Sequence, residues 1–600
     1  MRLTRKLAPW IAGLLAATLL FALLFVFTGF RYSGNDDSPI LRSFMGYEGG
    51  TPARFNLYTH TAFAWLLYGL ALAFPGVAWF SILQLFLLWF SCVVIVKGLV
   101  SCARVNGCPL WMGVLGGCLF IAAFAVFTLC RISYTTTGAL AGAAAVAQIL
   151  GVDCRRGSFA QILRGTALSI ALLLCCYCLR QISVLPPLVF WLLALAWMAL
   201  ERCRPSRPVS PEPVPASGKE APAPSSGQTQ ADIQGNAKPF LITALICALC
   251  FGVFAGVRAM ELNALNLGDY LAWQDARIQL IDYAGFEDAD MAALPDVGWT
   301  EAQTTLVMNW FFMDANITTQ AFQTLHDALV ADTPANSVRS SLQTLSGFLA
   351  ANPAYVPACG VLGLLGLAGM LPLVRRRGQG IGRSLAVGAG LLSAVAMLLF
   401  LGYRGRLPMR AVASVFFPLA VFLLCLSMRP PRPVKTRNAA AITLLVCAGC
   451  IALAAASFSR TIPLLNPTID PEIQYRLEAI PADLNEYALD NPDILIIYDT
   501  SLTGDNRLFP DTSDGIPPNL MFWGGWPAHS PSWLHQLSVY GIDGNALTAQ
   551  DFLRGNVILA STDAQPWESF IAYVQESSEG IVDWDFYEYG YVSFFQLYEY

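Results

Sequence analysis

The sequence predicts an all-α polytopic membrane bundle of about 11–13 transmembrane helices, with an external helical insertion and a small external C-terminal α/β domain. The first observation behind this fold class is composition. Of the 600 residues, 55% are hydrophobic and only 13% are charged, whereas soluble globular chains carry about 25% charged residues. The second observation is that the charges are segregated along the chain, and the third is a series of apolar runs.

Two long segments are strongly acidic. Residues 259–352 hold twelve Asp and Glu against two Lys and Arg, and residues 459–600 hold 21 against four. The rest of the chain is basic, with thirty Lys and Arg against eight Asp and Glu. Basic short loops stay on the cytoplasmic side of a membrane, whereas long acidic segments can be translocated. Both acidic segments are therefore expected outside, and the net charge of −5 argues against a nucleic-acid partner.

The apolar runs place the crossings. Met1–Pro9 carries three basic residues, and no small-residue cleavage site follows the first run, which predicts an uncleaved first span and a cytoplasmic N-terminus. An external C-terminus requires an odd number of crossings, so either one short run between His60 and Lys97 does not cross or a crossing elsewhere is missed. The runs cover residues 10–30, 61–75, 79–100, 111–130, 133–152, 165–181, 184–201, 239–258, 354–374, 385–403, 409–428 and 439–458.

The same patterns divide the chain into six parts. Residues 202–238 are rich in Pro, Ser, Ala and Gly with little apolar bulk, so we expect a disordered cytoplasmic linker there. The other parts are an N-terminal bundle at 1–201 with an external loop at 31–60, a transmembrane helix at 239–258, an external acidic helical domain at 259–352, transmembrane helices at 353–458, and an external acidic α/β domain at 459–600.

Local signals predict elements in the two acidic segments. In the first, apolar residues at helical spacing run through Leu265–Ala284, Thr300 and Gln303 form a capping-box pattern, and Asn336 or Ser337 can cap a helix that ends near Ala351. In the second, short aliphatic runs predict strands at 493–498 and 556–560, a helical period predicts a helix at 567–575, and aromatic alternation predicts a closing strand at 589–598.

The first external loop carries the best candidate for chemistry. Asp36 and Asp37 follow the first span within the sequence Asn-Asp-Asp-Ser, and Glu48, Arg54 and His60 follow them. Of a carboxylate pair, one member can take a proton from a nucleophile while its neighbour holds a hydroxyl group or a divalent cation. The same four residues are also typical of a solvated turn or a helix N-cap. Position on the chain decides between these interpretations.

A polytopic chain whose first span is followed by an external Asp-Asp pair resembles the GT-C superfamily of integral-membrane glycosyltransferases. The loop also resembles that of bacterial membrane proteins with an Asn-Asp-Asp first external loop. The resemblance covers about fifty residues, and it implies that the first loop bears the acidic residue that activates the acceptor hydroxyl group. It carries over onto Asp36 and Asp37 alone. No fuller metal motif is present, so the resemblance names no certain cofactor, and a divalent cation stays an open expectation.

Arginines at the outer ends of later spans are the second candidate group. Arg404, Arg406 and Arg410 lie between two spans on the predicted outer side, against the usual preference for basic residues inside. Arg131 and Arg180 are predicted to be external as well. Arginine binds phosphate oxygens bidentately, so these residues would suit a phosphate leaving group and would line one cavity with Asp36 and Asp37. The alternatives are an inverted local topology or side chains that snorkel to lipid headgroups.

These expectations combine into one function and one alternative. The first is a multi-pass cell-membrane glycosyltransferase that moves a sugar from a polyprenyl-phosphate donor to an acceptor glycan or lipid on the outer face, with an Asp general base. Glu48, Arg54 and His60 would then assist in substrate binding. The alternative is a non-catalytic transporter or cell-envelope scaffold with external binding domains. A transporter should place charges inside its spans, whereas the acids here gather at the outer edge.

Overall fold

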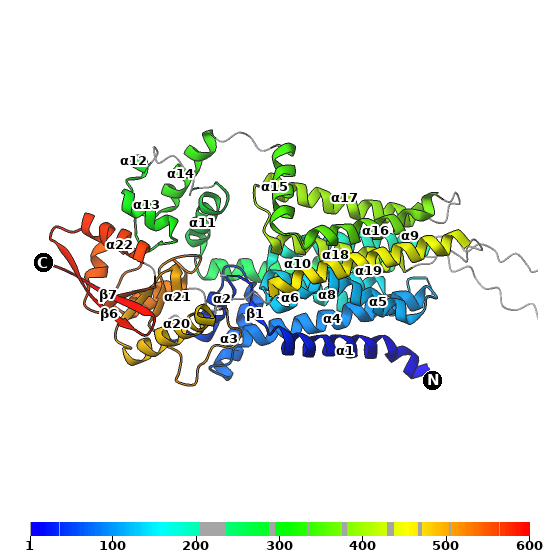
Figure 1. Ribbon diagram of the computed structural model, residues 1–600, viewed down its shortest axis with the longest axis horizontal. Helices are drawn as coiled ribbons and strands as arrows, with labels where there is room; N and C mark the ends of the chain where they lie inside the picture. The colour runs from blue at the N-terminus through cyan, green and yellow to red at the C-terminus, as the bar shows by residue number, and fades with distance from the viewer. Residues whose placement is uncertain are drawn as a thin grey trace, which may run out of the picture.

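A computed structural model shows a long helical bundle with a mixed α/β domain at one end (Figure 1). The predicted fold class is confirmed. The N-terminus lies at the end of the bundle opposite to the C-terminus (Figure 1), and we call the end that bears the α/β domain the domain end. The structure describes residues 2–34, 36–47, 49–155, 157–203, 236–284, 286, 294–332, 337–374, 381–428, 437–465, 471–502, 506–562 and 564–600. Most of the expected linker at 202–238 lies outside these residues.

Nine helices or joined helices of the described chain are long and apolar enough to cross a membrane. A tenth candidate is α16 (Tyr355–Val374), which is bent by 114° from the preceding α15 (Val338–Ala351). The nine are α1 (Arg2–Phe27), α4 (Trp79–Val105), α5 with η1 and α6 (Leu110–Phe120, Ile121–Ala125, Val126–Cys130), α8 (Phe159–Leu179), η2 with α9 (Gln181–Val184, Leu185–Cys203), α10 (Lys238–Ala264), α17 (Ile381–Tyr403), α18 (Met409–Ser427) and α19 (Arg437–Leu465).

The centre of the bundle is α7 (Tyr134–Leu150), in which every residue is buried. Its sequence is rich in Ala, Gly and Thr, and such small residues let helices approach closely. A Cβ atom on Gly142 would lie 2.4 Å from the ring of Pro187 in α9, so glycine is required there. The helix packs against α4, α8 and α18. It is about 26 Å long at 1.5 Å per residue, close to the thickness of a bilayer core.

The crossing conflict between His60 and Lys97 is resolved by α3 (Thr61–Ala73). This helix has 13 residues, about 20 Å, and it lies beside α2 (Asp37–Met45) at the domain end (Figure 1). The region therefore holds one full crossing, α4. By length and composition the described residues hold nine candidate spans, or ten if the bent pair of α15 and α16 counts as one span.

The first acidic segment is helical, as predicted. Thr300 caps α13 by accepting from the Gln303 N–H group at 3.1 Å, and Ser337 caps α15 through a capping box. The predicted helix over 265–284 is α11 followed by a turn of π-helix, η3. The helices of this segment outside α15 are α11 (Gly268–Arg277), η3 (Ile278–Tyr283), α12 (Leu294–Val297), α13 (Glu301–Met308) and α14 (Thr319–Asp332).

The C-terminal domain is a five-stranded mixed sheet in the order β4-β3-β5-β7-β6. The parallel strands β4, β3 and β5 are short and aliphatic, and β7 runs antiparallel to both β5 and β6. Sequence patterns indicated β3, β5, β7 and α22 but missed β4, β6, α20 and α21. The elements are α20 (Pro471–Asp490), β3 (Leu495–Tyr498), η6 (Thr500–Leu502), β4 (Leu520–Phe522), α21 (Pro531–Val539), η7 (Ala549–Leu553), β5 (Val557–Ser561), α22 (Ala564–Glu576), β6 (Val582–Tyr589) and β7 (Val592–Glu599).

The two acidic segments share one hydrophobic core, although the sequence predicted two separate domains. Alternate residues of β3 point to opposite faces of the sheet. Ile496 and Tyr498 pack with α20, whereas Leu495 and Ile497 join a cluster that includes Trp273, Phe311 and Phe312 of the insertion. The Tyr573 hydroxyl group also donates to Asp314 of the insertion. The insertion therefore covers one face of the C-terminal sheet.

The first loop joins the C-terminal domain to the bundle. The N–H group of Tyr32 donates to the carbonyl of Asn506 at 2.9 Å, and that of Gly49 donates to Pro518 at 3.1 Å. Ser81 at the start of α4 donates to Leu508 at 2.5 Å. The two-residue strands β1 (Arg31–Tyr32) and β2 (Arg131–Ile132) pair in parallel at the ends of α1 and α6. These contacts place the predicted acid loop between membrane helices and the α/β domain.

Candidate active site

The centre of the site is an ion pair between Asp36 and Arg410. Oδ2 of Asp36 lies 2.7 Å from Nη1 of Arg410, and the two side chains are 23% and 30% exposed. Asp36 occupies the N-cap position of α2, but its side chain makes no capping hydrogen bond. The N-cap interpretation of Asp36 therefore does not account for its carboxylate. Folding brings together two residues that are 374 positions apart in the sequence.

Asp37 lies beside this pair and is fully buried. Its Oδ1 accepts from the N–H group of Tyr134 at 2.8 Å, at the first residue of α7. Ser133, the N-cap residue of α7, makes no side-chain cap bond, so Asp37 supplies from α2 the acceptor that this helix start requires. The pKa of Asp37 is raised to about 7, chiefly by burial and also by the charge of Asp36, although the Tyr134 hydrogen bond and the charge of Arg410 lower it.

Neutral polar groups complete the surroundings of Asp37. Its Oδ2 is buried and has no hydrogen-bond partner among the described residues, and the same holds for Nε2 of Gln84. Gln84 lies close enough to lower the pKa of the carboxyl group, and its Oε1 accepts from the hydroxyl group of Thr137 at 3.2 Å. Asp37 is therefore held between α2, α4 and α7, where it fixes the position of Asp36.

The three predicted arginines of the 404–410 loop take different partners. Arg410 stands in the first turn of α18 and contacts Asp36. Arg406 pairs with Asp282 of the insertion at 2.5 Å, and Arg404 stacks over the ring of Tyr283 at 4.9 Å. Only Arg410 of the three contacts the acid pair directly. The other two attach the end of α17 to the π-helical turn η3.

A cluster of tyrosines and Arg180 adjoins the acid pair. Arg180, the C-cap of α8, donates to the hydroxyl groups of Tyr134 at 3.1 Å and Thr135 at 2.7 Å, and it stacks on the rings of Tyr58 and Tyr134. Burial raises the pKa of Tyr58 to about 12, and the largest charge effect on it comes from Asp36. Tyr58, Tyr134 and Arg180 therefore form one wall next to Asp36.

The other predicted residues lie in different surroundings. Arg54 is exposed and lies 5.1 Å from the ring of Tyr68. His60 caps α3, and its ring nitrogens are engaged with the N–H group of Ala62 and the carbonyl of Phe254. Arg131 donates to the carbonyl of Leu465 at the end of α19. Glu48 lies outside the described residues.

Sequence patterns missed the aromatic part of this site. Tyr58 and Tyr134 carry no local motif, because each is one tyrosine among apolar or small residues. Arg180 was expected at an outer helix end, but nothing in its neighbourhood assigned it a partner. The available signal was its position, since an arginine that ends a long apolar run must find acceptors or aromatic faces near the membrane edge.

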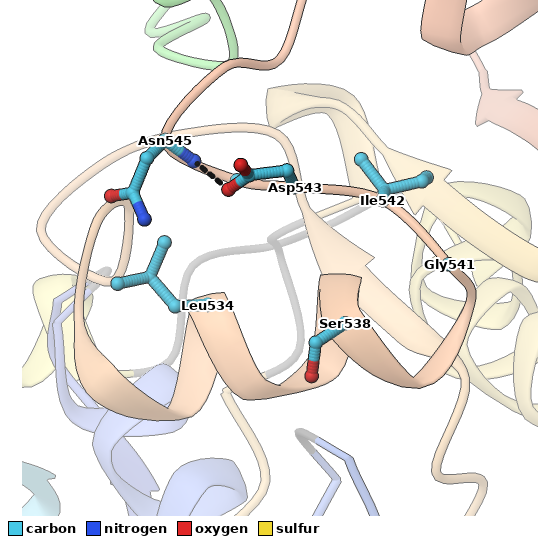
Figure 2. A pocket seen from close by; sticks show the side chains of 7 residues that line it. Leu534, Ser538, Gly541, Ile542, Asp543 and Asn545 are labelled. Atoms are coloured by element: carbon cyan, nitrogen blue, oxygen red, sulfur yellow. Dashed lines mark hydrogen bonds between the residues drawn. The ribbon is translucent and has the colours of Figure 1, made fainter.

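The described residues hold neither a metal-ligand cluster nor a major surface hollow at the acid pair. Among the described residues, no three His, Cys, Asp or Glu side chains gather as metal ligands. A hollow of about 380 Å³ lies elsewhere, beside α21, and Figure 2 shows Leu534, Ser538 and Asn545 around it. Oδ1 of Asp543 accepts from the N–H group of Asn545 there at 3.0 Å. The hollow is lined by a turn whose Asp543 side chain is hydrogen-bonded to the backbone.

Comparison with protein-family models and with curated proteins gives no match. Among solved structures, the chain is similar to ArnT from Cupriavidus metallidurans bound to undecaprenyl phosphate, with 12% identity and a TM-score of 0.38 over 99% of this chain and 98% of that one. It is also similar to the oligosaccharyltransferase AglB from Archaeoglobus fulgidus in complex with an inhibitory peptide and a dolichol-phosphate, with 12% identity and a TM-score of 0.39 over 98% of this chain and 74% of that one.

Proposed function

We propose that this protein is a membrane glycosyltransferase that moves a sugar from a polyprenyl-phosphate donor to an acceptor glycan or lipid. The observation that carries the proposal is the Asp36–Arg410 pair, held at the membrane edge beside the buried Asp37. The Asp36 side chain is 23% exposed, so a hydroxyl group can reach it from outside. A lipid donor can approach the same point from the bundle. We further propose that the domain end faces the outside of the cell.

The roles follow from where each group lies. The acceptor hydroxyl oxygen attacks the anomeric carbon, its proton passes to Asp36, and the bond from the anomeric carbon to the phosphate oxygen breaks. Negative charge grows on the leaving phosphate, and fixed cations there lower the barrier. Arg410 uses one N–H group for Asp36, and its guanidinium has further donors for a phosphate oxygen. Asp37 holds α2 on α7 and so positions Asp36.

The direct contact between Asp36 and Arg410 changes one part of the expected arrangement. The sequence-based hypothesis placed the arginines in one cavity with Asp36, where they would bind the leaving phosphate. In the structure Arg410 contacts Asp36 itself, so its proposed role includes orienting that carboxylate. Arg180, the arginine on the other side of the tyrosine wall, then becomes the second candidate cation for the site.

Transfer by the purified full-length protein in lipid nanodiscs tests this function. The assay offers a panel of undecaprenyl-phosphate sugars and measures released undecaprenyl phosphate. Asp36→Asn keeps the size of the side chain but cannot accept a proton, so we expect turnover to fall by about 100-fold or more. Asp551→Asn is the matched control, since it removes a partly exposed ion pair with Arg554 in the C-terminal domain. Wild-type turnover by Asp36→Asn would refute the assignment of the base.

A further inference from the structure

Arg277 is a buried cation without a carboxylate partner among the described residues. It ends α11, and it is 1% exposed. Its Nε donates to Oε1 of Gln274 at 3.0 Å, its guanidinium lies 5.6 Å from the ring of Trp310 and 5.8 Å from that of Phe312, and its Nη1 is buried without a hydrogen-bond partner. A buried charge normally has a counter-ion or a ligand. Aromatic faces offset only part of the cost of burying it.

A chain of contacts links Arg277 to the acid pair. Gln274, which accepts from Arg277, donates through Nε2 to the carbonyl of Trp526 at 2.9 Å. The Trp526 ring meets the ring of Tyr58 edge-on, with centroids 5.6 Å apart. The charge of Asp36 raises the pKa of Tyr58, and the charges of Arg277 and Arg180 lower it. Arg277 therefore approaches the same tyrosine wall as Asp36, but from the insertion and not from the bundle.

The backbone around Arg277 is tightly constrained. Trp310, whose ring faces the guanidinium, has φ of +66°, which is a strained conformation for a residue other than glycine. A Cβ atom on Gly524 would lie 1.5 Å from the carbonyl oxygen of Trp310, so only glycine fits at that position. The fold holds this arginine in place at a conformational cost. Such strain is typical of ligand sites.

We propose that Arg277 binds an anionic group of the acceptor, a phosphate or a carboxylate. The inference rests on the proposed function and names its acceptor class. Arginine with a free N–H edge binds either anion through a charge-assisted fork. A lipid-borne donor enters from the bundle, where Arg410 and Arg180 lie, whereas Arg277 belongs to the insertion, which covers the C-terminal sheet. Arg277 therefore lies on the side of the site at which the acceptor would bind.

Thermal unfolding of the full-length protein in nanodiscs tests this proposal without requiring turnover. The soluble probe is inorganic phosphate, compared with sodium chloride at equal ionic strength, and the lipid probe is undecaprenyl phosphate. Saturating phosphate should raise the Tm of wild type, Asp36→Asn and the control Arg554→Met by about 2 °C, because a ligand that binds the native state alone stabilises it. Arg277→Met should lose the response to phosphate and keep the response to undecaprenyl phosphate. Arg277→Lys should keep a smaller response to phosphate.

Three results would overturn the proposal. They are a wild-type Tm that phosphate does not change, an undiminished response in Arg277→Met, and the loss of both responses in that variant, which would assign Arg277 to the donor phosphate. If Arg277→Met does not fold, the wild-type and Arg277→Lys responses decide. Because Asp36→Asn keeps its response to phosphate even when transfer is lost, failure of this inference can be distinguished from failure of the proposed function.

Discussion

The two ends of the bundle each hold an arginine–carboxylate pair, but the pairs have different surroundings. At the domain end, Asp36 and Arg410 stand among Asp37, tyrosines and Arg180. In the loop before α8, Arg155 pairs with the buried Glu201 at the end of α9. The next residue, Arg202, donates to the carbonyl groups of Cys154 and Gly157. That second cluster joins a loop to a helix end through backbone acceptors.

The two ion pairs differ in how far their carboxylates are exposed, and this difference separates a proposed catalytic pair from a structural one. The Arg155–Glu201 pair closes a loop, and Glu201 is 4% exposed in its side chain while Arg155 is 59% exposed. At the domain end both partners are partly exposed, at 23% for Asp36 and 30% for Arg410. A carboxylate that takes a proton from an incoming hydroxyl group must be within reach of that group, whereas the carboxylate of a structural ion pair can be buried. The predictions below separate these two roles.

Among the variants that compare the two ends, an arginine-to-lysine substitution made at each end should have the largest effect. Arg410→Lys keeps the charge but loses the planar fork that can hold Asp36 and a phosphate oxygen together. We expect turnover to fall by about tenfold, the equivalent of roughly 1.4 kcal/mol of transition-state stabilisation. Arg155→Lys should leave turnover within about twofold of wild type. Equal losses in the two variants would remove the distinction between the ends.

A smaller effect is expected from the helix that connects the ends. Gly142→Val in α7 places a side chain where a Cβ atom would already lie 2.4 Å from Pro187, so overpacking should lower the Tm by several degrees. Gly363→Val in α16 is the matched control, because nothing lies within 4 Å of its Cβ position. Differential scanning fluorimetry in nanodiscs measures both. Similar Tm values for the two variants would contradict the close packing of α7.

The smallest expected effect is a change in the stability of the protein with pH, caused by the titration of Asp37. Its pKa is raised to about 7 in the folded protein, against about 3.9 in an unfolded chain. Below pH of about 4 the carboxyl group is protonated in both states. As pH rises from about 4 to about 7, the unfolded state ionises first, so wild type loses stability. Asp37→Asn removes this titration.

The measurement for Asp37 is the Tm of wild type minus that of Asp37→Asn between pH 4.5 and 7.5. The difference should fall by a few degrees as pH rises and level off above pH of about 7.5. A flat difference, or one that rises with pH, would show that Asp37 is not the buried neutral acid described above. Asparagine can still accept from the Tyr134 N–H group, so the variant keeps the helix cap.

Much of the fold could be predicted because membrane helices and helix caps have local causes. Most of the apolar run at 165–181 lies in α8, which ends at Leu179, and Thr300 and Ser337 cap the helices expected of them. Strand β6 was missed because it is an edge strand, where acids such as Asp583 and Asp585 interrupt the apolar alternation. The shared core of the insertion and the C-terminal sheet was missed because periodicity shows that a face is apolar, and not which partner covers it.

The candidate site could be predicted only in part for a related reason. Asp36 and Asp37 are adjacent in the sequence and follow a span, so position and composition singled them out. Arg404, Arg406 and Arg410 look equivalent in the sequence, yet the fold gives them Tyr283, Asp282 and Asp36 as partners. The burial of Arg277 depends on Trp310 and Phe312 from another part of the insertion. No local pattern encodes contacts of this kind.

The central claim is that Asp36 and Arg410 act as one unit in sugar transfer, and a double-mutant cycle of turnover tests it most directly. Residues that act as a unit have non-additive effects on rate. Asp36→Asn combined with Arg410→Lys should therefore reduce turnover of the undecaprenyl-phosphate sugar by about as much as Asp36→Asn alone, on the order of 100-fold. A double variant in which the two losses multiply to about 1,000-fold would show that the residues act separately, and wild-type turnover in either Asp36 variant would contradict the claim outright.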